Sequence, residues 1–561
     1  PRLVKPRSPA FSSLFGGPSI STYLPSSRRA LHAEKATPDD LFDYTSGRWI
    51  YNEALRLSER KSVFNVPGLR LLVAQSVGRS PSDILSLTKL AEGGFNRSFL
   101  ITMHDGFQMV ARIPYPYNRP SYHLLASEVA TMDYLRTVAG IPIPEVYGYS
   151  PGEDSAAETE YIFMEYVRGT TLGAVWTGLA EKDFVSIMRQ LVELEAKMMG
   201  VEFPAGGSLY YARDLEKVGG EGIQLPDDAQ FCIGPDVSGW LWHGRRSRLQ
   251  VNRGPYKTME EALVRGAHKE LAFLERFGQP LLPFNRWRRE LYNYQEQLPS
   301  DHAENLDRYL LIAPSILPQD PALGSFRIRH PDLTHANNIL ISRTTDSDEW
   351  KICSLIDWQH ASILPISLLA GIPGCMECGR SDFDPKTRPS LPDYFAEVEW
   401  MRPQMTHYLY LKDTEELNPL HYAALSDPQR ELRQHLFEDS SRPWTSETLH
   451  LKYSLMQATQ KWDALAGPGA GPCPIAFNPE DVTEAERLHK RLDKADFNNS
   501  FCEGFMGCGR QGSVENQAYE LALRRLGEMT DDWFSELETE EERANFLAHY
   551  EFGDMDEEPY M

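Results

Sequence analysis

Three polar residues in the second half of the chain have the types and the order that phosphoryl transfer from a nucleotide requires. Asp332 and Asn337 lie five residues apart in the segment His-Pro-Asp-Leu-Thr-His-Ala-Asn, and Asp357 follows the apolar stretch Ile-Cys-Ser-Leu-Ile. One carboxylate can orient or deprotonate a hydroxyl, while an amide and a second carboxylate can hold magnesium on the phosphates. We therefore assign Asp332 as the catalytic carboxylate, with Asn337 and Asp357 as the metal ligands.

The choice of the amide has an alternative. Asn338 directly follows Asn337, and the apolar residues typical of a strand begin only after it, at Ile339. Alignment on that strand favours Asn338. The distance along the chain from Asp332 favours Asn337, which is the residue we choose. His330 is expected to brace this loop rather than to transfer a proton.

The bulk composition excludes several classes of function. The 561 residues are 41% hydrophobic and 24% charged, with a net charge of −23. General nucleic-acid binding needs basic surface that this balance does not provide. No apolar run approaches the ~20 residues that span a bilayer. We expect no nucleic-acid partner and no membrane span, and the sequence leaves the oligomeric state undefined.

The seven cysteines do not indicate a disulfide framework in a chain of this length. Cys375 and Cys378 have the spacing of metal ligands, and Cys502 and Cys508 could complete a zinc site. The wider spacing of the second pair is not usual for a zinc knuckle. We therefore expect reduced thiols.

The two ends of the chain differ from the rest. The first 33 residues contain five basic residues, seven serines and no acid, which is typical of a mitochondrial transit peptide; a disordered basic tail is the alternative. We assign residues 1–38 to this leader and expect a mitochondrial protein. Acidic residues gather near the other end, where we expect residues 531–561 to form a solvated acidic tail.

The sequence between these ends changes from strand-rich to helix-rich. Strands are expected in two glycine-turn regions and one later apolar segment, at 90–101, 107–113 and 161–166. Apolar residues at helical spacing predict helices over 124–135 and 184–198. Two further strands, 338–342 and 351–356, are expected on either side of a polar loop. This order indicates two lobes with a cleft between them, an N-lobe over 39–166 and a C-lobe over 167–530.

The motifs around the three polar residues carry a family resemblance. The run His330-Pro-Asp332-Leu-x-x-x-Asn337, with Ile356-Asp357-Trp358 after it, resembles the aminoglycoside phosphotransferase/choline-kinase-like superfamily, which shares the protein-kinase fold. Shorter segments resemble a fungal, mitochondrial group of this superfamily: Val110–Pro114, Phe231–Pro235, His243–Arg246 and Arg253–Pro255. The resemblance covers roughly residues 40–530. It implies an α+β, bilobal fold with a small antiparallel-sheet N-lobe and a larger, mainly helical C-lobe.

The resemblance also implies ATP and Mg²⁺ as cofactors and assigns roles to nucleotide-binding residues. Gly93, Gly94 and Asn96 lie where the family has its phosphate-covering loop. Two glycines allow backbone N–H groups to approach phosphate oxygens. Taken alone, two glycines between strands indicate only a hairpin.

Four more residues complete the implied nucleotide site. Arg112 takes the place of the lysine that contacts the α- and β-phosphates, and Glu128 is the helix glutamate that pairs with it. Arginine is a planar fork rather than a point charge, so this replacement is a departure from the family pattern; the fungal group also carries arginine here. Backbone groups of Glu165 and Val167 would hold adenine at the hinge between the lobes, in a segment that otherwise reads as a core strand meeting a loop.

These features predict an ATP- and Mg²⁺-dependent phosphotransferase that acts on a hydroxyl of an unidentified small molecule. The alternative is a mitochondrial pseudokinase with an interaction or assembly role, which the arginine at position 112 favours. Transfer of a nucleotidyl group to protein is compatible with the fold but has no supporting motif. The acidic balance would suit a cationic acceptor, although net charge does not report the charge of a pocket.

Overall fold

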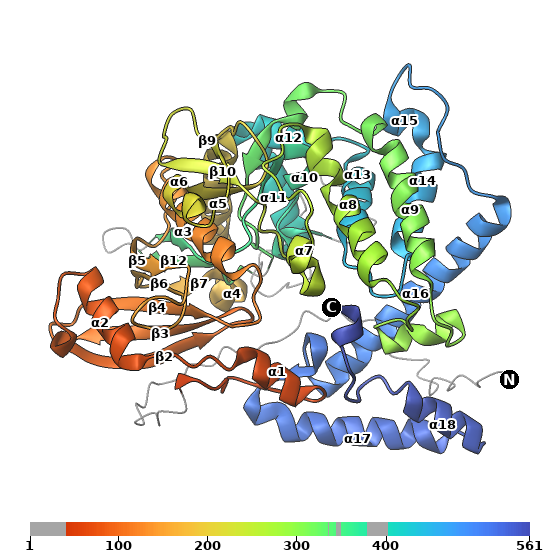
Figure 1. Cartoon of the computed structure of the whole chain (residues 1–561), viewed down its shortest axis with the longest axis horizontal. Coiled ribbons are helices and arrows are strands. Elements are labelled where there is room, and N and C mark those ends of the chain that lie inside the picture. Colours follow the sequence, from red (N-terminus) through yellow and green to blue (C-terminus); the bar gives the residue numbers. More distant parts are fainter. Residues whose placement is uncertain (1–40, 335, 344–348, 379–401) are drawn as a thin grey trace.

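The structure, a computed structural model, describes residues 41–334, 336–343, 349–378 and 402–561. The leader expected over residues 1–38 lies outside the described residues. The chain forms a smaller lobe built on a β-sheet and a larger, mainly helical lobe (Figure 1). The α+β, two-lobed fold predicted from the sequence is therefore confirmed.

A five-stranded antiparallel sheet forms the N-lobe, in the order β2-β3-β4-β6-β5. Its strands are β2 Ile84–Glu92, β3 Asn96–Met103, β4 Gln108–Pro114, β5 Val146–Ser150 and β6 Tyr161–Glu165. Burial alternates residue by residue along β3, because successive side chains of a strand point to opposite faces. The strand, glycine turn and strand expected over residues 90–101 form the β2–β3 hairpin, which Gly93 N closes by donating to Asn96 O at 2.9 Å.

Two helices cover the two faces of this sheet. α2 (Val66–Ser76) packs with Met109 and Ala111, whereas α3 (Ser121–Thr137) packs with Val110. The alternation along β4 therefore turns Arg112, two residues after Val110, towards α3. This local geometry sets up the contact between Arg112 and the helix that carries Glu128.

Long helices that share one apolar cluster build the C-lobe. They are α5 Glu181–Gly200, α8 Met259–Phe277, α9 Pro299–Ile312, α11 Arg402–Leu417, α13 Arg430–Ser441 and α14 Leu449–Gln460. The apolar stripe expected over 184–198 lies on the buried side of α5. Shorter helices complete the lobe: α4 Leu172–Val175, α6 Ala212–Lys217, α7 Gly239–Trp242, α10 Ile366–Leu369, α12 Pro419–Leu425 and α15 Trp462–Ala466.

Short strands carry the segments around the candidate site. β12 (Ile339–Arg343) pairs antiparallel with both β13 (Trp350–Leu355) and β7 (Thr170–Thr171), which confirms the two strands expected around the polar loop. β11 (Phe326–Ile328) pairs with β14 (Ile363–Pro365). A third small sheet packs against α3 from the C-lobe side, and its strands are β8 Ser208–Tyr211, β9 Ile223–Gln224 and β10 Phe231–Gly234.

The C-terminal segment returns to the beginning of the N-lobe. Ile50 and Tyr51, just before α1, pack against Met506 and Leu526 of the C-terminal segment, and α17 is drawn below α1 in Figure 1. The elements involved are α1 Glu53–Arg60, α16 Pro479–Met506, α17 Tyr519–Ser535 and α18 Glu540–Ala548. β15 (Ser513–Val514) pairs with β1 (Arg48–Trp49), so strands from the two ends of the described chain meet. The boundary expected at 530/531 falls inside α17, and the division into domains stays a prediction.

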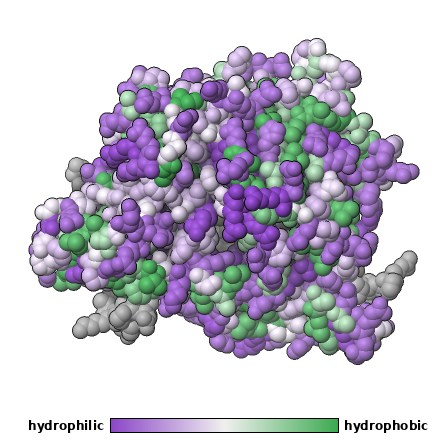
Figure 2. Space-filling view, in the orientation of Figure 1, coloured by the Kyte–Doolittle hydropathy of each residue, from purple (hydrophilic) through white to green (hydrophobic). Residues whose placement is uncertain are grey.

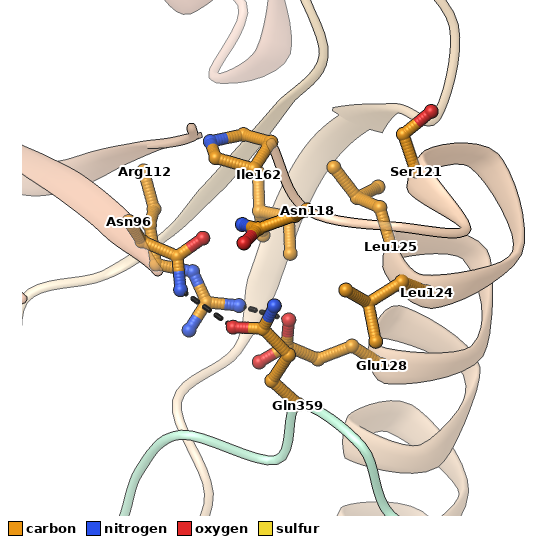
Figure 3. Close-up of a pocket in the computed structure, with 10 residues that line it drawn as sticks. Asn96, Arg112, Asn118, Ser121, Leu124, Leu125, Glu128, Ile162 and Gln359 are labelled. Atoms are coloured by element: carbon orange, nitrogen blue, oxygen red, sulfur yellow. Dashed lines mark hydrogen bonds and ion pairs between the residues drawn. The ribbon is translucent and has the colours of Figure 1, made fainter. Parts of the chain in front are cut away.

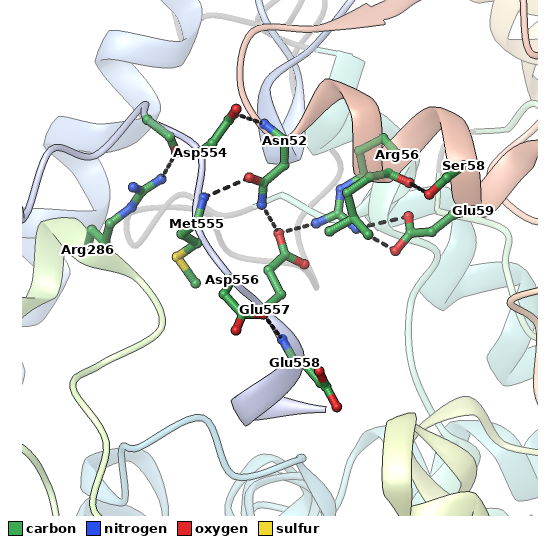
Figure 4. A network of polar contacts seen from close by, with 12 residues as sticks. Asn52, Arg56, Ser58, Glu59, Arg286, Asp554, Met555, Asp556, Glu557 and Glu558 are labelled. Carbon is green, nitrogen blue, oxygen red and sulfur yellow. Dashed lines mark hydrogen bonds and ion pairs between the residues drawn. The ribbon is translucent and has the colours of Figure 1, made fainter.

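Glu557 ties the C-terminal segment to α1 (Figure 4). Its carboxylate accepts a hydrogen bond from Asn52 Nδ2 at 2.6 Å and pairs with Arg56, and the Glu557 and Arg56 side chains are each only 5% exposed. Tyr560 is also buried, and its hydroxyl donates to Leu282 O at 2.7 Å. The expected solvated acidic tail does not hold for Glu557 and Tyr560, because their partners come from segments far away in the sequence.

No helix among the described residues is both long enough and apolar enough to cross a membrane. α16 has the length, with 28 residues, but charged side chains occur along it. The face drawn in Figure 2 is mostly hydrophilic, with hydrophobic residues gathered in separate patches.

Candidate functional site

The pairing of β12 with β13 brings the ends of two loops together. Ile339 pairs with Leu355, so the residues just outside this pair, Asn338 and Ile356, also lie opposite each other. Ile356 N donates to Asn338 O at 3.0 Å, and Asp357 follows immediately. Antiparallel pairing therefore places Asn338 beside the residue that precedes Asp357, although 19 positions separate Asn338 and Asp357 in the sequence.

His330 connects the Asp332 loop to the same strand end. Its Nδ1 accepts from Asp332 N at 3.1 Å, and its Nε2 lies 3.0 Å from Ile356 O. Burial lowers the pKa of His330 to about 4, so the ring is neutral at pH 7. An acceptor at Nδ1 fixes the proton on Nε2, which donates to the carbonyl. His330 thus braces the loop, as expected from the sequence.

Asp332 presents its carboxylate at the surface of this loop. Its Oδ1 accepts from Thr334 N at 3.1 Å. Asn338 Nδ2 donates to Asp332 O at 2.8 Å and lies 3.4 Å from Asp332 Oδ2. These contacts orient the carboxylate while the Asp332 side chain remains exposed. An exposed, oriented carboxylate is suited to accept a proton from a hydroxyl.

The structure brings Asn338, rather than Asn337, to Asp332. Asn338 is half-buried and bonded to Asp332, whereas Asn337 is exposed. Ala336 adopts a left-handed conformation with φ 55°, so the chain turns sharply before the two asparagines. This turn changes which of the two asparagines faces Asp332, which the number of residues between them does not reveal. The choice of Asn337 as the metal ligand stays a prediction. Asn338, the alternative suggested by the start of the strand at Ile339, is the asparagine that contacts Asp332.

Arg112 and Glu128 form a buried ion pair between β4 and α3 (Figure 3). Their side chains are 9% and 3% exposed, and Arg112 Nη2 contacts Glu128 Oε2. Burial raises the pKa of Glu128, and the neighbouring Arg112 charge opposes that rise. The pairing implied by the family resemblance is therefore present in the structure.

Asp357 lies on the other side of the Arg112 guanidinium. Its Oδ1 is 3.6 Å from Arg112 Nη1 and is a buried oxygen without a hydrogen-bond partner. Asp357 adopts a left-handed backbone conformation with φ 68°, which a residue other than glycine adopts at a cost of about 1 kcal/mol or more. The Asp357 side chain is 41% exposed, and a carboxylate that is accessible beside a phosphate site suits a divalent cation.

The glycine turn is braced by the connection between β4 and α3. Phe95 O accepts from Tyr115 N at 2.9 Å and from Asn118 Nδ2 at 2.6 Å, and the Tyr117 hydroxyl contacts Gly94 O. Sequence reasoning missed Tyr115, Tyr117 and Asn118. No motif marks them, because their role depends on the hairpin folding back over them.

A small cavity lies between the glycine turn, the Arg112–Glu128 pair and α3. Asn96, Ser121, Leu124, Ile162 and Gln359 are among its lining residues (Figure 3). Its volume is about 10 Å³, which is room for roughly one water molecule. The cavity is therefore too small to hold a nucleotide.

Glu165 and Val167 lie where the chain passes from one lobe to the other. Glu165 is the last residue of β6, and its N–H donates to Glu145 O at 2.8 Å. A few residues later the chain enters β7, which pairs with β12 in the C-lobe. The chain therefore crosses between the lobes in this segment, and the role of Glu165 and Val167 as a hinge that contacts adenine stays a prediction.

The two lobes and the placement of Asp332 and Asp357 define a kinase-like fold of the small-molecule phosphotransferase class. The chain belongs to the phosphotransferase enzyme family, which matches residues 86–367. The family resemblance inferred from the sequence is confirmed.

Several known proteins are similar over most of the chain. A subtelomeric hrmA-associated cluster protein of Aspergillus fumigatus is 30% identical over 483 residues, which cover 78% of this chain and 91% of that protein. The mitochondrial protein "altered inheritance of mitochondria protein 9" of Saccharomyces cerevisiae is 23% identical over 547 residues, which cover 82% of this chain and 85% of that protein. The match to a solved structure, the streptomycin–ATP–APH(2")-IIa ternary complex, has 13% sequence identity and a TM-score of 0.34. It covers 71% of this chain and 97% of the chain in that structure.

Proposed function

We propose that the protein transfers a phosphoryl group from ATP, in the presence of Mg²⁺, to a hydroxyl of a small molecule. The observation that carries this proposal is the convergence of Asp332, Asn338 and Asp357 through His330 and the β12–β13 pairing. An exposed carboxylate for the hydroxyl stands beside an amide and a second carboxylate that suit a cation bound to phosphates. This combination is what phosphoryl transfer needs.

Asp332 is the proposed catalytic residue. Its backbone and carboxylate are held by His330, Thr334 and Asn338, so the carboxylate does not have to be ordered when an acceptor arrives. It orients the acceptor hydroxyl and accepts its proton as the oxygen attacks. Positioning of this kind accounts for much of the catalysis of phosphoryl transfer.

Asp357 and Asn338 are the residues that we propose would hold Mg²⁺. The 41% exposure of the Asp357 side chain leaves its carboxylate accessible to a cation and supports this role. Asn338 uses its Nδ2 to contact Asp332 O, which leaves its carbonyl oxygen as a ligand. Bound Mg²⁺ would neutralise negative charge on the transferred phosphate. Asn337, the ligand chosen from sequence distance, serves as the matched comparison.

The remaining predicted residues form the proposed nucleotide site. Gly93, Gly94 and Asn96 would cover the phosphates, and Arg112, held by Glu128, would contact them. Backbone groups of Glu165 and Val167 would hold adenine. These residues lie in the β2–β3 hairpin, β4, α3 and the segment that leads from β6 to the C-lobe, and this grouping in one lobe and its connection supports the assignment.

We also propose a mitochondrial location, which the name of the yeast relative and the basic, acid-free first 33 residues support. The acceptor is a small-molecule hydroxyl of unassigned chemistry.

Thermal-shift titration tests nucleotide binding directly. The melting temperature should rise with ATP plus Mg²⁺, and Asp357→Ala should lose the Mg²⁺-dependent part of that rise. Asn337→Ala, next to the site but exposed, is the control and should behave as the unaltered protein. If ATP does not change the melting temperature with or without Mg²⁺, the alternative is favoured: a pseudokinase that binds no nucleotide.

A further inference from the structure

Asn96 occupies a fixed place at the end of the glycine turn. It is the first residue of β3, and its carbonyl accepts from Gly93 N across the turn. The turn is also fixed to the β4–α3 connection, because Phe95 O accepts hydrogen bonds from Tyr115 N and Asn118 Nδ2. The Asn96 side chain therefore projects from a braced backbone.

Gln359 occupies an equally fixed place two residues after Asp357. Its neighbour Trp358 is fully buried, with Nε1 donating to Leu355 O at 3.1 Å. Its other neighbour, His360, bonds through Nδ1 to Val237 O at 2.8 Å. The Gln359 side chain is itself only 6% exposed. Both flanking residues are anchored in the C-lobe, so the direction of the Gln359 side chain is set by the fold.

These two side chains meet across the lobes. Asn96 Nδ2 donates to Gln359 Oε1 at 2.8 Å (Figure 3). Next to this bond, the rings of Phe95 and His360 meet edge to face with centroids 5.3 Å apart. Two consecutive residues of the glycine turn thus contact two consecutive residues of the Asp357 loop, 263 positions apart for the Asn96–Gln359 pair.

We propose that Asn96 and Gln359 form a latch that sets the position of the glycine turn over the phosphates, which makes Gln359 a positioning residue of the site. This inference rests on the proposed function. The latch closes over Arg112 and leaves a cavity of only about 10 Å³ behind it. The hydrogen bond therefore fixes the spacing between the turn, which would cover the phosphates, and the Asp357 carboxylate, which would hold their metal.

The chemistry of the two amides allows a discriminating set of variants. Asn96→Asp leaves an acceptor to which the Gln359 amide can donate after rotating, and Gln359→Glu leaves an acceptor for Asn96 Nδ2. Each single variant keeps one donor and one acceptor. The double variant places two carboxylates against each other, and it has no donor and loses the bond when both are ionised. Gln359→Asn removes the contact without adding charge, because its side chain is one methylene shorter.

Hydrogen exchange in the nucleotide-free protein tests the latch independently of catalysis. The amides of residues 93–97 should exchange within about two-fold of the unaltered protein in each single carboxylate variant. They should exchange roughly ten-fold faster in the double variant and several-fold faster in Gln359→Asn, as expected for loss of one hydrogen bond. Equal exchange in the double and single variants would overturn the proposal.

Steady-state kinetics tests the positioning role. The KM for ATP should rise in the double variant by more than the product of the two single effects, with a smaller change in kcat. Effects of the two single variants that simply multiply in the double variant would contradict the latch. If the unaltered protein binds no ATP, the proposed function fails, while the exchange experiment still decides whether the latch exists.

Discussion

Arg112 Nη1 lies 3.6 Å from Oδ1 of Asp357, while the other arm of the same guanidinium contacts Glu128. Arg112, which is expected to bind phosphate, is therefore in contact with Asp357, which is expected to bind the metal. A planar fork can reach two carboxylates at once, which a compact ammonium does less well. The arginine that departs from the family pattern thus has a structural role in this chain.

Replacement of Arg112 tests that role. Arg112→Gln leaves the Glu128 carboxylate buried without a charge partner and should lower the free energy of unfolding by about 3 kcal/mol. Arg112→Lys keeps the charge beside Glu128 and should cost about 1 kcal/mol. Urea unfolding at pH 7 measures both. Equal losses in the two variants would mean that the ion pair does not stabilise the fold.

The two neighbouring asparagines should differ in their effect on magnesium. Asn338→Ala removes the amide that contacts Asp332 and should raise the Mg²⁺ concentration needed for half-maximal turnover by at least about ten-fold. Asn337→Ala should change it by less than about two-fold, because Asn337 is exposed. Mg²⁺ titration of turnover measures the difference. A larger effect at Asn337 would restore the assignment made from sequence distance.

Glu557 should contribute to stability far more than its neighbour. Glu557→Ala leaves the buried donors of Asn52 and Arg56 without this acceptor and should lower the free energy of unfolding by about 2 kcal/mol. Glu558 has an exposed side chain, so Glu558→Ala should stay within about 0.5 kcal/mol. Chemical denaturation of both variants compares them, and matching values would remove the role given to the C-terminal contact.

His330 should make stability fall in acid. Burial holds its pKa at about 4 in the folded protein, below the ~6.5 of an unfolded chain. The unfolded chain therefore binds the proton first, and the contribution of the neutral ring is complete above about pH 6.5 and is lost as the pH falls towards 4.

His330→Gln keeps a donor and an acceptor in the side chain but does not titrate. Between pH 7 and pH 5 the unaltered protein should lose about 2 kcal/mol more than this variant. Denaturant unfolding at the two pH values gives the comparison. An identical loss in both proteins would show that His330 does not titrate as described.

Features with a local signal could be predicted from the sequence. The β2–β3 hairpin, β4 and β6 follow from short apolar segments, whereas β5 (Val146–Ser150) was not predicted; the apolar stripe of α5 follows from its helical spacing. Asp332 and Asp357 were identified because a motif surrounds each of them. The pairing of Arg112 with Glu128 came from the family resemblance, and the alternation of β4 explains it.

Features that depend on long-range packing gave no such signal. The β1–β15 pair consists of two-residue strands from opposite ends of the described chain, too short for any periodicity. The Asn96–Gln359 bond joins residues 263 positions apart. Which of Asn337 and Asn338 contacts Asp332 depends on the left-handed turn at Ala336. An alanine rarely adopts that conformation, so the sequence gives no sign of the turn.

Product analysis with Asp332→Asn tests the central claim most directly. Purified protein, ATP and Mg²⁺ are mixed with a mitochondrial metabolite extract, and untargeted mass spectrometry follows metabolites that gain one phosphoryl group. We expect the unaltered protein to form such a product and Asp332→Asn to form it roughly 10²–10⁴-fold more slowly, with the thermal shift by ATP and Mg²⁺ retained. Equal product formation by both proteins, or none by the unaltered protein, would contradict the account.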